Sequence, residues 1–490
     1  MHKLYLRIIG NLCYIIGAYN LKVRDNSTNY CYCYMERKVI LNRKLYNKLL
    51  DWKKETNGKK ALLIEGARRI GKSTLCEQFA KNEYESYLII DFAIQDPRVE
   101  SIFRENLGDL DTFFMLLEAH YGVSLRPRKS VIIFDEVQMF PYARTAIKYL
   151  VADGRYDYIE TGSLISIKDN VKNILIPSEE RSITMYPLDL EEFASALGKT
   201  QLLEYARICF EKKTPLERSM HNEAMLLFQE YMLVGGMPRP VVTYMESRKD
   251  FTAVDKEKRD ILKLYKQDIM KIDAQYRSKV LSIFEQIPGF LSGHERRVVF
   301  NKIKPGTHAE QYGDTFFWLA DSMICNECFL CNDPNVGLSL NENRGYIKCY
   351  MGDTGLLVSH AFDENELLEN EVYKQILAGK LQFNKGMIYE NAIAQMLVAN
   401  GHKLFFYTHY NDIKHRNDIE IDFLTSNNSK LKYKIFPIEV KSSKHYKATS
   451  LIRFNEKFKT RIGESYIIHP RNLTVKDNII SIPPYMTTYL

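Results

Sequence analysis

Residues 66–73 read Gly-Ala-Arg-Arg-Ile-Gly-Lys-Ser, which fits the pattern GxxxxGK(S/T) of a phosphate-binding loop. An apolar run at 61–64 precedes the pattern and a helix-like stretch at 74–81 follows it, so the order is strand, loop and helix. Glycines let the backbone turn sharply, and the helix N-terminus presents N–H groups and partial positive charge to an anion. The sequence therefore predicts a nucleoside triphosphate site formed by Gly66, Ala67, Arg68, Arg69, Ile70, Gly71, Lys72, Ser73 and Thr74.

A second motif supports this interpretation. Residues 131–136 read Val-Ile-Ile-Phe-Asp-Glu, a run of four apolar residues that ends in two acids. Such a run is typical of a buried parallel strand that delivers carboxylates to the carboxyl edge of its sheet. With a nucleotide bound, Lys72 would reach the β- and γ-phosphates and Ser73 would hold Mg²⁺.

Length and composition limit the class of protein. A chain of 490 residues is too long for one core and suggests about three or four domains. With 45% hydrophobic and 26% charged residues, the composition is ordinary for a soluble globular protein. Residues 401–490 carry 15 Lys and Arg against 8 Asp and Glu, a difference of +7 that equals the net charge of the whole chain. This basic end is compatible with nucleic-acid binding, although a solvated basic face is the commoner explanation.

Cysteines and apolar segments indicate the compartment. Nine cysteines do not make a secreted disulfide framework in a chain of this size, so a cytoplasmic protein is expected. Cys325, Cys328, Cys331 and Cys349 lack the paired spacing of a zinc ribbon and overlap an apolar run, 318–330, that resembles a helix; we interpret them as buried free thiols. The apolar stretch at 4–18 is interrupted and too short for a membrane helix.

The hydrophobic pattern predicts an amphipathic helix over 39–52 and then alternating strands and helices. Four strands are expected, at 61–65, 87–91, 131–135 and 158–161. This alternation predicts a parallel sheet with helices on both faces. Ser163 follows the last of these strands and is either a sensor of the γ-phosphate or an ordinary helix cap.

The middle of the chain has a helical pattern in place of alternating strands and helices. Residues 189–285 are helical by pattern, with a turn at Leu233-Val234-Gly235-Gly236-Met237-Pro238. Residues 280–345 hold shorter helices and polar loops and are compatible with a winged-helix module.

The C-terminal part carries a second group of chemically suggestive residues. A helix at 385–399, strands at 403–408, 419–424 and 435–440, a helix near 448–459 and a strand at 465–468 make a second α/β unit. Carboxylates on adjacent strands can hold a divalent cation, and a lysine beside them can stabilise a phosphate or hydroxide. The candidates are Glu390, Asp422 and Glu439 as metal ligands, with Glu439 and Lys441 as catalytic groups. This is the order of a PD-(D/E)xK nuclease core, although a Glu/Lys pair on a strand is usually a solvated salt bridge.

Together these motifs resemble a family of prokaryotic AAA+-like P-loop ATPases with a C-terminal domain of unknown function. The resemblance covers the chain from Met35 onward and rests on the loop at 66–73 and on motifs spread along the rest of the chain. These motifs are Phe134-Asp135-Glu136-Val137-Gln138, Thr161-Gly162-Ser163, Tyr186-Pro187-Leu188, Gly235-Gly236-Met237-Pro238, Tyr265 with Asp268-Ile269, Lys348-Cys349-Tyr350 with Asp353, and Ile438-Glu439-Val440-Lys441.

The resemblance implies roles and boundaries. Ser73 and Asp135 would hold Mg²⁺, Lys72 would bind the phosphates of ATP, and Glu136 would polarise the hydrolytic water. Arg68 and Arg69 either contact phosphate or pair with acids elsewhere. The expected parts are an N-terminal extension at 1–34, disordered or misannotated, an ATPase domain at 35–199, a helical and winged-helix-like region at 200–345 and a restriction-endonuclease-like α/β domain at 346–490.

Two functions remain open at this point. In the first, Mg²⁺-dependent ATP hydrolysis drives a nuclease-like domain that acts on nucleic acid, most simply DNA. In the second, the chain is a nucleotide-switched module that binds DNA or protein without cutting. Either protein could be an oligomer, and neither is expected to need a membrane.

Overall fold

The computed structural model describes part of the chain in detail. The described residues are 23–24, 30–31, 39–162, 178–293, 296–303, 306, 312–364, 367–378, 380, 384–413, 415–426, 434–443 and 445–490. The chain divides into two compact units, Met1–Leu41 and Asn42–Leu490. In the first unit, β1 (Val23–Arg24) pairs antiparallel with β2 (Tyr30–Cys31). Most of the predicted extension at 1–34 lies outside the described residues.

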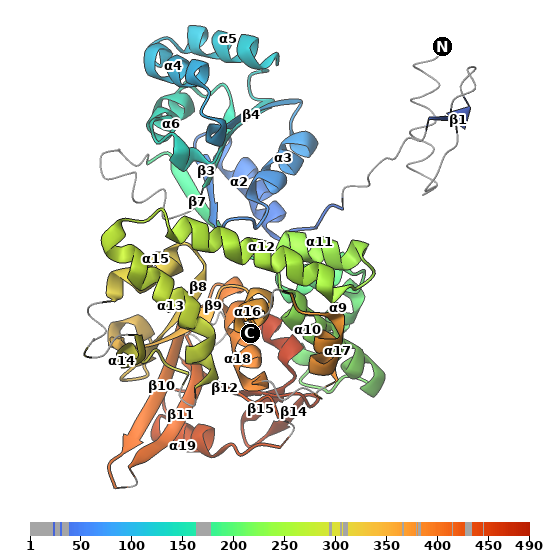
Figure 1. The fold of residues 1–490 in the computed structure, drawn as a ribbon, viewed down its shortest axis with the longest axis vertical. Helices are drawn as coiled ribbons and strands as arrows, with labels where there is room; N and C mark the ends of the chain where they lie inside the picture. The colour runs from blue at the N-terminus through green and yellow to red at the C-terminus, as the bar shows by residue number, and fades with distance from the viewer. Residues whose placement is uncertain are drawn as a thin grey trace. The chain divides into compact units, whose positions relative to one another are not determined.

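A parallel five-stranded sheet carries the phosphate-binding motif. Its strands lie in the order β4-β5-β6-β3-β7, and every neighbouring pair is parallel. Strands β3, β4 and β7 of this sheet are labelled in Figure 1. The predicted parallel sheet is therefore confirmed, and the four predicted strands differ from the observed ones by no more than one residue at either end. The strands are β3 (Ala61–Gly66), β4 (Ser86–Asp91), β5 (Ser130–Asp135), β6 (Asp157–Gly162) and β7 (Glu180–Met185).

Helices cover both faces of this sheet, as the alternating pattern predicts. Helix α3 contacts β3, β5 and β6, and α2 packs against α3. The opposite face shares one hydrophobic core with α4, α5 and α6, in which Phe103 contacts Phe113 and Phe134 edge-on. The helices are α2 (Leu45–Thr56), α3 (Lys72–Glu83), α4 (Pro97–Asn106), α5 (Leu110–Tyr121) and α6 (Tyr142–Asp153), with short 3₁₀ turns η1 (Phe92–Ile94) and η2 (Val137–Met139). The helix predicted over 39–52 therefore begins later, at Leu45.

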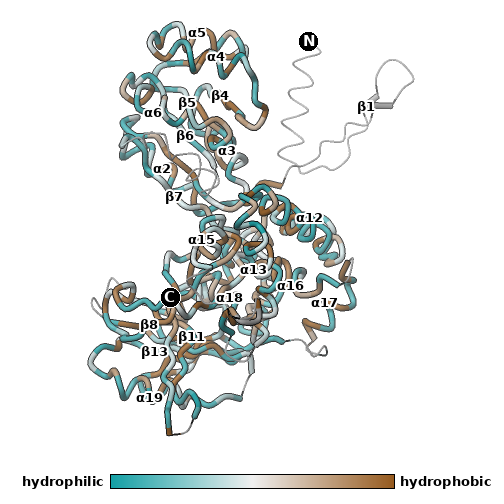
Figure 2. Tube along the Cα trace, turned by 60° about the vertical axis from the view of Figure 1, so that its left-hand side comes forward, coloured by the Kyte–Doolittle hydropathy of each residue, from teal (hydrophilic) through white to brown (hydrophobic). Residues whose placement is uncertain are grey.

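The middle of the chain is helical, as predicted. Helix α12 alternates hydrophilic and hydrophobic residues along its length (Figure 2), which is typical of a helix with one buried face. No helix among the described residues is long and apolar enough to cross a membrane. The helices are α8 (Leu190–Ala196), α9 (Thr200–Glu211), α10 (Arg218–Val234), α11 (Pro238–Glu246), α12 (Phe251–Ile269), α13 (Ala274–Ser292), α14 (Phe300–Ile303) and α15 (Gly313–Asp321).

A mixed eight-stranded sheet forms the C-terminal part. Its order is β14-β15-β13-β12-β11-β10-β8-β9. The predicted helix, three strands, helix and strand are confirmed as α18, β10, β11, β12, α19 and β13. The elements are β8 (Cys325–Cys331), η4 (Leu338–Asn341), β9 (Glu342–Met351), α16 (Thr354–Ala361), α17 (Asn370–Leu377), α18 (Lys385–Ala399), β10 (Leu404–Asn411), β11 (Arg416–Thr425), β12 (Phe436–Val440), α19 (Thr449–Lys457), β13 (Ser465–Ile468), β14 (Thr474–Lys476), β15 (Ile479–Ile482) and η5 (Pro484–Tyr489).

One expectation for residues 280–345 is corrected by this sheet. The apolar run at 318–330 is not one helix, because helix α15 ends at Asp321 and strand β8 runs from Cys325 to Cys331. The winged-helix module stays a prediction: α13, α14 and α15 are followed by the antiparallel pair β8 and β9, and β8 also pairs with β10 of the C-terminal sheet. The predicted boundary at 345/346 falls inside β9. Cys325, Cys328, Cys331 and Cys349 are buried and free, as interpreted.

The turn between α10 and α11 is packed too tightly for any side chain. At Gly236, an added Cβ would lie 2.1 Å from the backbone oxygen of Leu188. Gly235 adopts a φ of 84°, and its Cβ would lie 2.2 Å from Oδ1 of Asp353. The two glycines therefore bring the α10–α11 turn against both the segment after β7 and the start of α16.

We expect Gly236→Ala to lower the free energy of unfolding by about 1–3 kcal/mol, because backbone atoms cannot move aside as a flexible side chain would. The midpoint of urea unfolding measures this effect. Gly108→Ala is the matched control, because nothing lies within 4 Å of its Cβ. Equal midpoints for the two variants would contradict the packing argument.

Candidate nucleotide site and C-terminal polar cluster

Lys72 lies where the motif predicts, at the first position of α3. Its Nζ donates to the backbone oxygens of Gly66 and Ala67 at 3.0 and 3.1 Å, so the side chain folds back over the loop. Burial lowers the pKa of Lys72, while the carboxylates of Glu136 and Asp135 act in the opposite direction. A buried ammonium held above the loop is suited to bind a phosphate.

The backbone of the loop explains its glycines. Gly71 is the N-cap of α3 and has a φ of 91°, a backbone conformation that residues other than glycine rarely adopt. At Gly66, a Cβ would lie 2.5 Å from the backbone oxygen of Met185 in β7. Arg69 also has a positive φ, 69°, without being glycine. The glycines at 66 and 71 are thus required by the close approach of β7 and by the positive φ at the start of α3.

Asp135 joins the loop to the two neighbouring strands. Ser73 Oγ donates to Asp135 Oδ1 at 2.8 Å, and the hydroxyl of Thr161 donates to the same oxygen. Thr161 also accepts from the backbone N–H of Glu136 at 3.2 Å. Strand β6 lies between β3 and β5, so Thr161 reaches both the loop strand and the acidic strand. A hydroxyl and a carboxylate in contact are the donor set that Mg²⁺ uses beside a nucleotide.

Glu136 is held in an uncommon conformation beside this pair. Its φ is 52°, in the left-handed region, and Gln138 Nε2 donates to its carboxylate. Backbone strain of this type occurs preferentially at functional sites. The side chain predicted to polarise water is therefore fixed by a buried glutamine two residues later.

Not every predicted contact appears at the loop. Arg68 pairs with Asp268 of α12 instead of lying free in the loop, which is the second of the two roles left open for it. Thr74 and Arg69 are exposed. Ser163 lies outside the described residues, and the polar group that contacts the acids is Thr161. Thr161 is the fifth residue of β6. It lies beside Asp135 because of the order of the strands in the sheet, which cannot be read from the sequence.

A buried arginine anchors the loop from outside the motif. Arg43 donates to the backbone oxygens of Ile70 and Tyr186 at 3.0 and 2.5 Å and pairs with Glu192 at 3.2 Å. Its side chain is 7% exposed. Arg43 lies outside every motif quoted from the sequence, although its partners Tyr186 and Glu192 lie in or near one of them.

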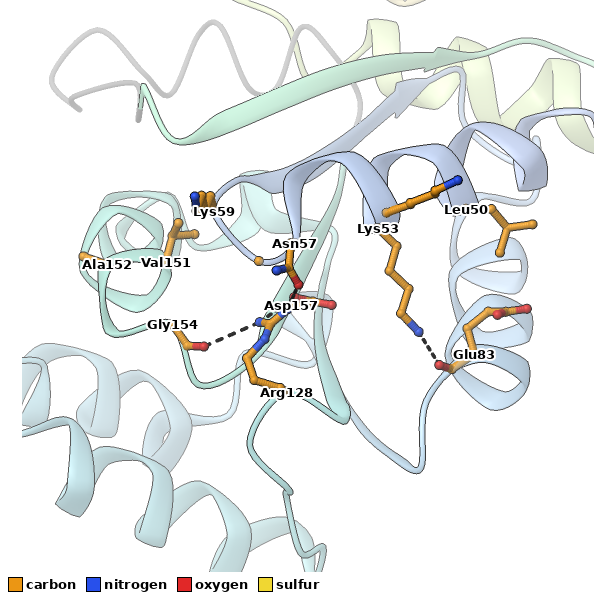
Figure 3. Close-up of a pocket in the computed structure, with 12 residues that line it drawn as sticks. Leu50, Lys53, Asn57, Lys59, Glu83, Arg128, Val151, Ala152, Gly154 and Asp157 are labelled. Carbon is orange, nitrogen blue, oxygen red and sulfur yellow. Dashed lines mark hydrogen bonds and ion pairs between the residues drawn. The ribbon is translucent and has the colours of Figure 1, made fainter.

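The opposite end of the same sheet carries a basic hollow of about 990 Å³ (Figure 3). Its lining includes Lys53, whose ammonium donates to the backbone oxygen of Glu83, and Arg128, which pairs with Asp157 at 2.9 Å. Asp157 begins β6, whereas the phosphate-binding loop follows the end of β3. The hollow is therefore separate from the nucleotide site.

Two of the four C-terminal candidates, Glu390 and Asp422, flank a lysine that was not among the predicted site residues. Lys348 Nζ lies 3.0 Å from Glu390 Oε1 and 3.8 Å from Asp422 Oδ1. Lys441 pairs with Glu439 at 2.6 Å, and Val440 N–H donates to Asp422 at 2.8 Å. Lys348 belongs to the sequence motif Lys348-Cys349-Tyr350, and this motif was the one feature of the sequence that pointed to it.

The charges of this cluster are largely balanced by the protein itself. Glu390 is fully buried. It accepts hydrogen bonds from the ammonium of Lys348 and the hydroxyl of Tyr350, and it forms an ion pair with Arg296. Burial raises the pKa of Glu439 to about 7 against the opposing charge of Lys441. Burial alone would lower the pKa of Lys441, but Glu439 raises it above its ordinary value. Within the described ranges, no group of three or more His, Cys, Asp or Glu is arranged to hold a metal ion.

Comparisons with known proteins agree with the first site. Residues 58–194 match the model of an AAA domain, residues 225–366 match a domain of unknown function (DUF8612), and residues 385–485 match another (DUF4143). The N-terminal part of the chain is thus an AAA-like P-loop ATPase domain. No curated protein matches the chain.

Solved structures that resemble the chain do so distantly. The Walker-type ATPase PABY2304 of Pyrococcus abyssi is 16% identical over 66% of this chain and 97% of its own, with a TM-score of 0.37. The RuvB Holliday junction branch migration motor of Thermotoga maritima is 11% identical over 69% and 95%, with a TM-score of 0.28. Cdc6p from Pyrobaculum aerophilum is 10% identical over 71% and 97%, with a TM-score of 0.26. Likenesses at this level do not bear on function.

We expect Thr161→Val to lower ATP turnover about 10- to 100-fold, because the hydroxyl that orients Asp135 is lost while the shape of the side chain is kept. The loss should be partly overcome by raising the Mg²⁺ concentration. Thr161→Ser keeps the hydroxyl and serves as the control. Equal turnover in the Val and Ser variants would contradict the role given to Thr161.

Proposed function

We propose that the chain is a Mg²⁺-dependent ATPase whose nucleotide state is relayed to its C-terminal sheet, which binds a partner without cutting it. The observation that carries the proposal is a series of buried hydrogen bonds from the phosphate-binding loop to helix α18. Lys72 and the loop N–H groups would hold the phosphates of ATP, and Ser73 with Asp135 would hold Mg²⁺. The metal would supply charge neutralisation at the phosphates.

The first half of the series leads from the loop to the α10–α11 turn. Arg43 joins the backbone oxygen of Ile70 to that of Tyr186. Two residues later, Leu188 N–H donates to the oxygen of Gly236 at 2.7 Å. The ring of Pro238 lies beside Gly71, 3.6 Å from the place of an added Cβ. A shift of the loop on nucleotide binding therefore meets the turn directly.

The second half leads from the turn into the C-terminal part. Gly236 N–H donates to Asp353 Oδ2 at 2.6 Å. Tyr231 donates to the oxygen of Leu188 at 2.9 Å and accepts from Gln395 of α18 at 3.0 Å. Gln395 also accepts from Thr354, the residue after Asp353. Buried polar groups that lose a partner cost free energy, so these contacts move together or break together.

Glu390 supports a binding role over a cutting role for the far end of this path. It lies on the same helix as Gln395. Lys348 and the hydroxyl of Tyr350 contact its Oε1, and Arg296 forms an ion pair with its Oε2. A nuclease needs that carboxylate, or an equivalent one, free for metal. The excess of positive charge over residues 401–490 makes DNA the partner class that we test first.

One observation favours the nuclease as a second candidate. Glu439 is 3% exposed, and its Oε2 has no hydrogen-bond partner. A buried oxygen without a partner, beside Asp422 and Lys441, is suited to receive a cation. The cleavage experiment below separates this candidate from the first.

Replacing Lys72 by Ala should lower ATP turnover by about 100-fold or more, because the ammonium that would bind the phosphates is lost together with its hydrogen bonds to the loop backbone. Release of phosphate in the presence of Mg²⁺ measures the effect. Lys81→Ala is the matched control on the same helix, since Lys81 is exposed and pairs with Glu77. Turnover retained in the Lys72 variant would overturn the site assignment.

The second experiment concerns the C-terminal sheet. We expect the chain to bind DNA with an affinity that depends on nucleotide and falls as salt rises, since phosphate contacts release counterions. We expect no cleavage with Mg²⁺ or Mn²⁺. Cleavage that Glu439→Gln and Lys441→Met abolish would replace the first candidate by the nuclease, and binding that ignores both nucleotide and salt would reject both.

A further inference from the structure

Arg68 is bound away from the nucleotide site in this structure. Its Nη1 lies 2.6 Å from Oδ1 of Asp268, near the end of α12. The hydroxyl of Tyr265, one turn earlier on the same helix, donates to the backbone oxygen of Arg68 at 3.5 Å. The pair spans 200 residues of sequence and joins the phosphate-binding loop to the helical region.

Helix α12 is also tied to the relay of the proposed function. Lys258 is fully buried and donates to the backbone oxygen of Leu233 at 2.9 Å, directly before the α10–α11 turn. It donates to the hydroxyl of Tyr373 at 2.8 Å, and that hydroxyl donates to Asp255 at 2.8 Å. Ten residues of helix, about 15 Å, separate Lys258 from Asp268. One rigid element therefore touches the loop at one point and the turn at another.

The competition for Arg68 follows from charge. A guanidinium in the loop is attracted by the phosphates of a bound nucleotide and by the carboxylate of Asp268. The pair is partly exposed, with side chains that are 45% and 25% accessible, so its geometry can change without opening the core. Asp268 keeps a second cation, Lys271, at 3.1 Å, and is not left unpaired when Arg68 leaves.

We propose that Arg68 and Asp268 form a nucleotide-sensitive latch: triphosphate draws Arg68 from Asp268 and releases the end of α12. This proposal rests on the proposed function, because it requires phosphates at the loop. It adds a residue outside the loop, Asp268, that opposes nucleotide binding, and it makes Arg68 a phosphate-binding residue that also couples the loop to α12.

The test is a double-mutant cycle for binding of the fluorescent N-methylanthraniloyl derivative of AMPPNP with Mg²⁺. Breaking an exposed ion pair releases about 0.2–1 kcal/mol, so Asp268→Asn should tighten binding about 1.5- to 5-fold. Arg68→Ala should weaken binding about tenfold, because a charge-assisted contact to phosphate is lost. In the Arg68→Ala background, Asp268→Asn should have no effect.

Each other outcome is decisive. If Asp268→Asn tightens binding equally with and without Arg68, the effect is general repulsion between the carboxylate and the nucleotide, and the latch is overturned. If Asp268→Asn binds as the wild type does while Lys72→Ala does not bind, the latch alone is overturned. If Lys72→Ala binds as well as the wild type, the nucleotide site is misplaced and both proposals fall.

A matched control and a structural readout complete the experiment. Asp363→Asn breaks a comparable pair with Lys266 of the same helix, at 3.1 Å, and should leave the affinity unchanged. In the wild type, AMPPNP should increase amide hydrogen exchange over residues 266–273. In Arg68→Ala the exchange of this segment should already be raised and should not respond to nucleotide; unchanged exchange in the wild type would overturn the latch.

Discussion

A single buried carboxylate, that of Asp353, joins the helical middle of the described chain to its C-terminal part. It accepts hydrogen bonds from the backbone of Gly236 at 2.6 Å and of Leu356 at 2.9 Å, and from Gln395 at 3.4 Å. Burial raises the pKa of Asp353, while these N–H groups hold it down. A fully buried acid is tolerable only because each contact is made, so the α10–α11 turn, α16 and α18 must keep their relative positions. Gly235 and Gly236 are glycines because this carboxylate and Leu188 leave no room for a side chain.

In the nucleotide site, too, a buried carboxylate holds neighbouring elements together through its hydrogen bonds. Asp135 is brought to the loop by the order of strands, because β6 separates the acidic strand from the loop strand and supplies Thr161 between them. The buried Lys72 and the two acids compensate one another in a region from which water is mostly excluded. The hydrogen bonds of Lys72 to the loop and of Ser73 to Asp135 hold both side chains in place beside the loop.

The C-terminal cluster shows how the same residue types can serve a different purpose. Glu390, Asp422, Glu439 and Lys441 come together as their order along the chain predicts, but Lys348 and Arg296 join them. Two additional cations change a set of carboxylates from a site that attracts metal into a network that is nearly neutral. Among the described residues of this cluster, Oε2 of Glu390 and Oε2 of Glu439 both have no hydrogen-bond partner, but Oε2 of Glu390 forms an ion pair with Arg296. The choice between docking and cutting therefore depends mainly on Oε2 of Glu439.

The sequence by itself determined the features that depend on neighbours along the chain. The strand, loop and helix around Lys72, the acidic end of β5 and the turn at Gly235-Gly236 are all local, because glycine conformation and hydrophobic period are properties of short segments. The tertiary structure alone decided which distant groups meet them. Thr161 contacts Asp135 because of sheet order, β8 and β9 extend the C-terminal sheet because β8 pairs with β10, and Arg68 meets Asp268 across 200 residues. Contacts of this kind depend on how elements pack, and no short-range pattern in the chain records that packing.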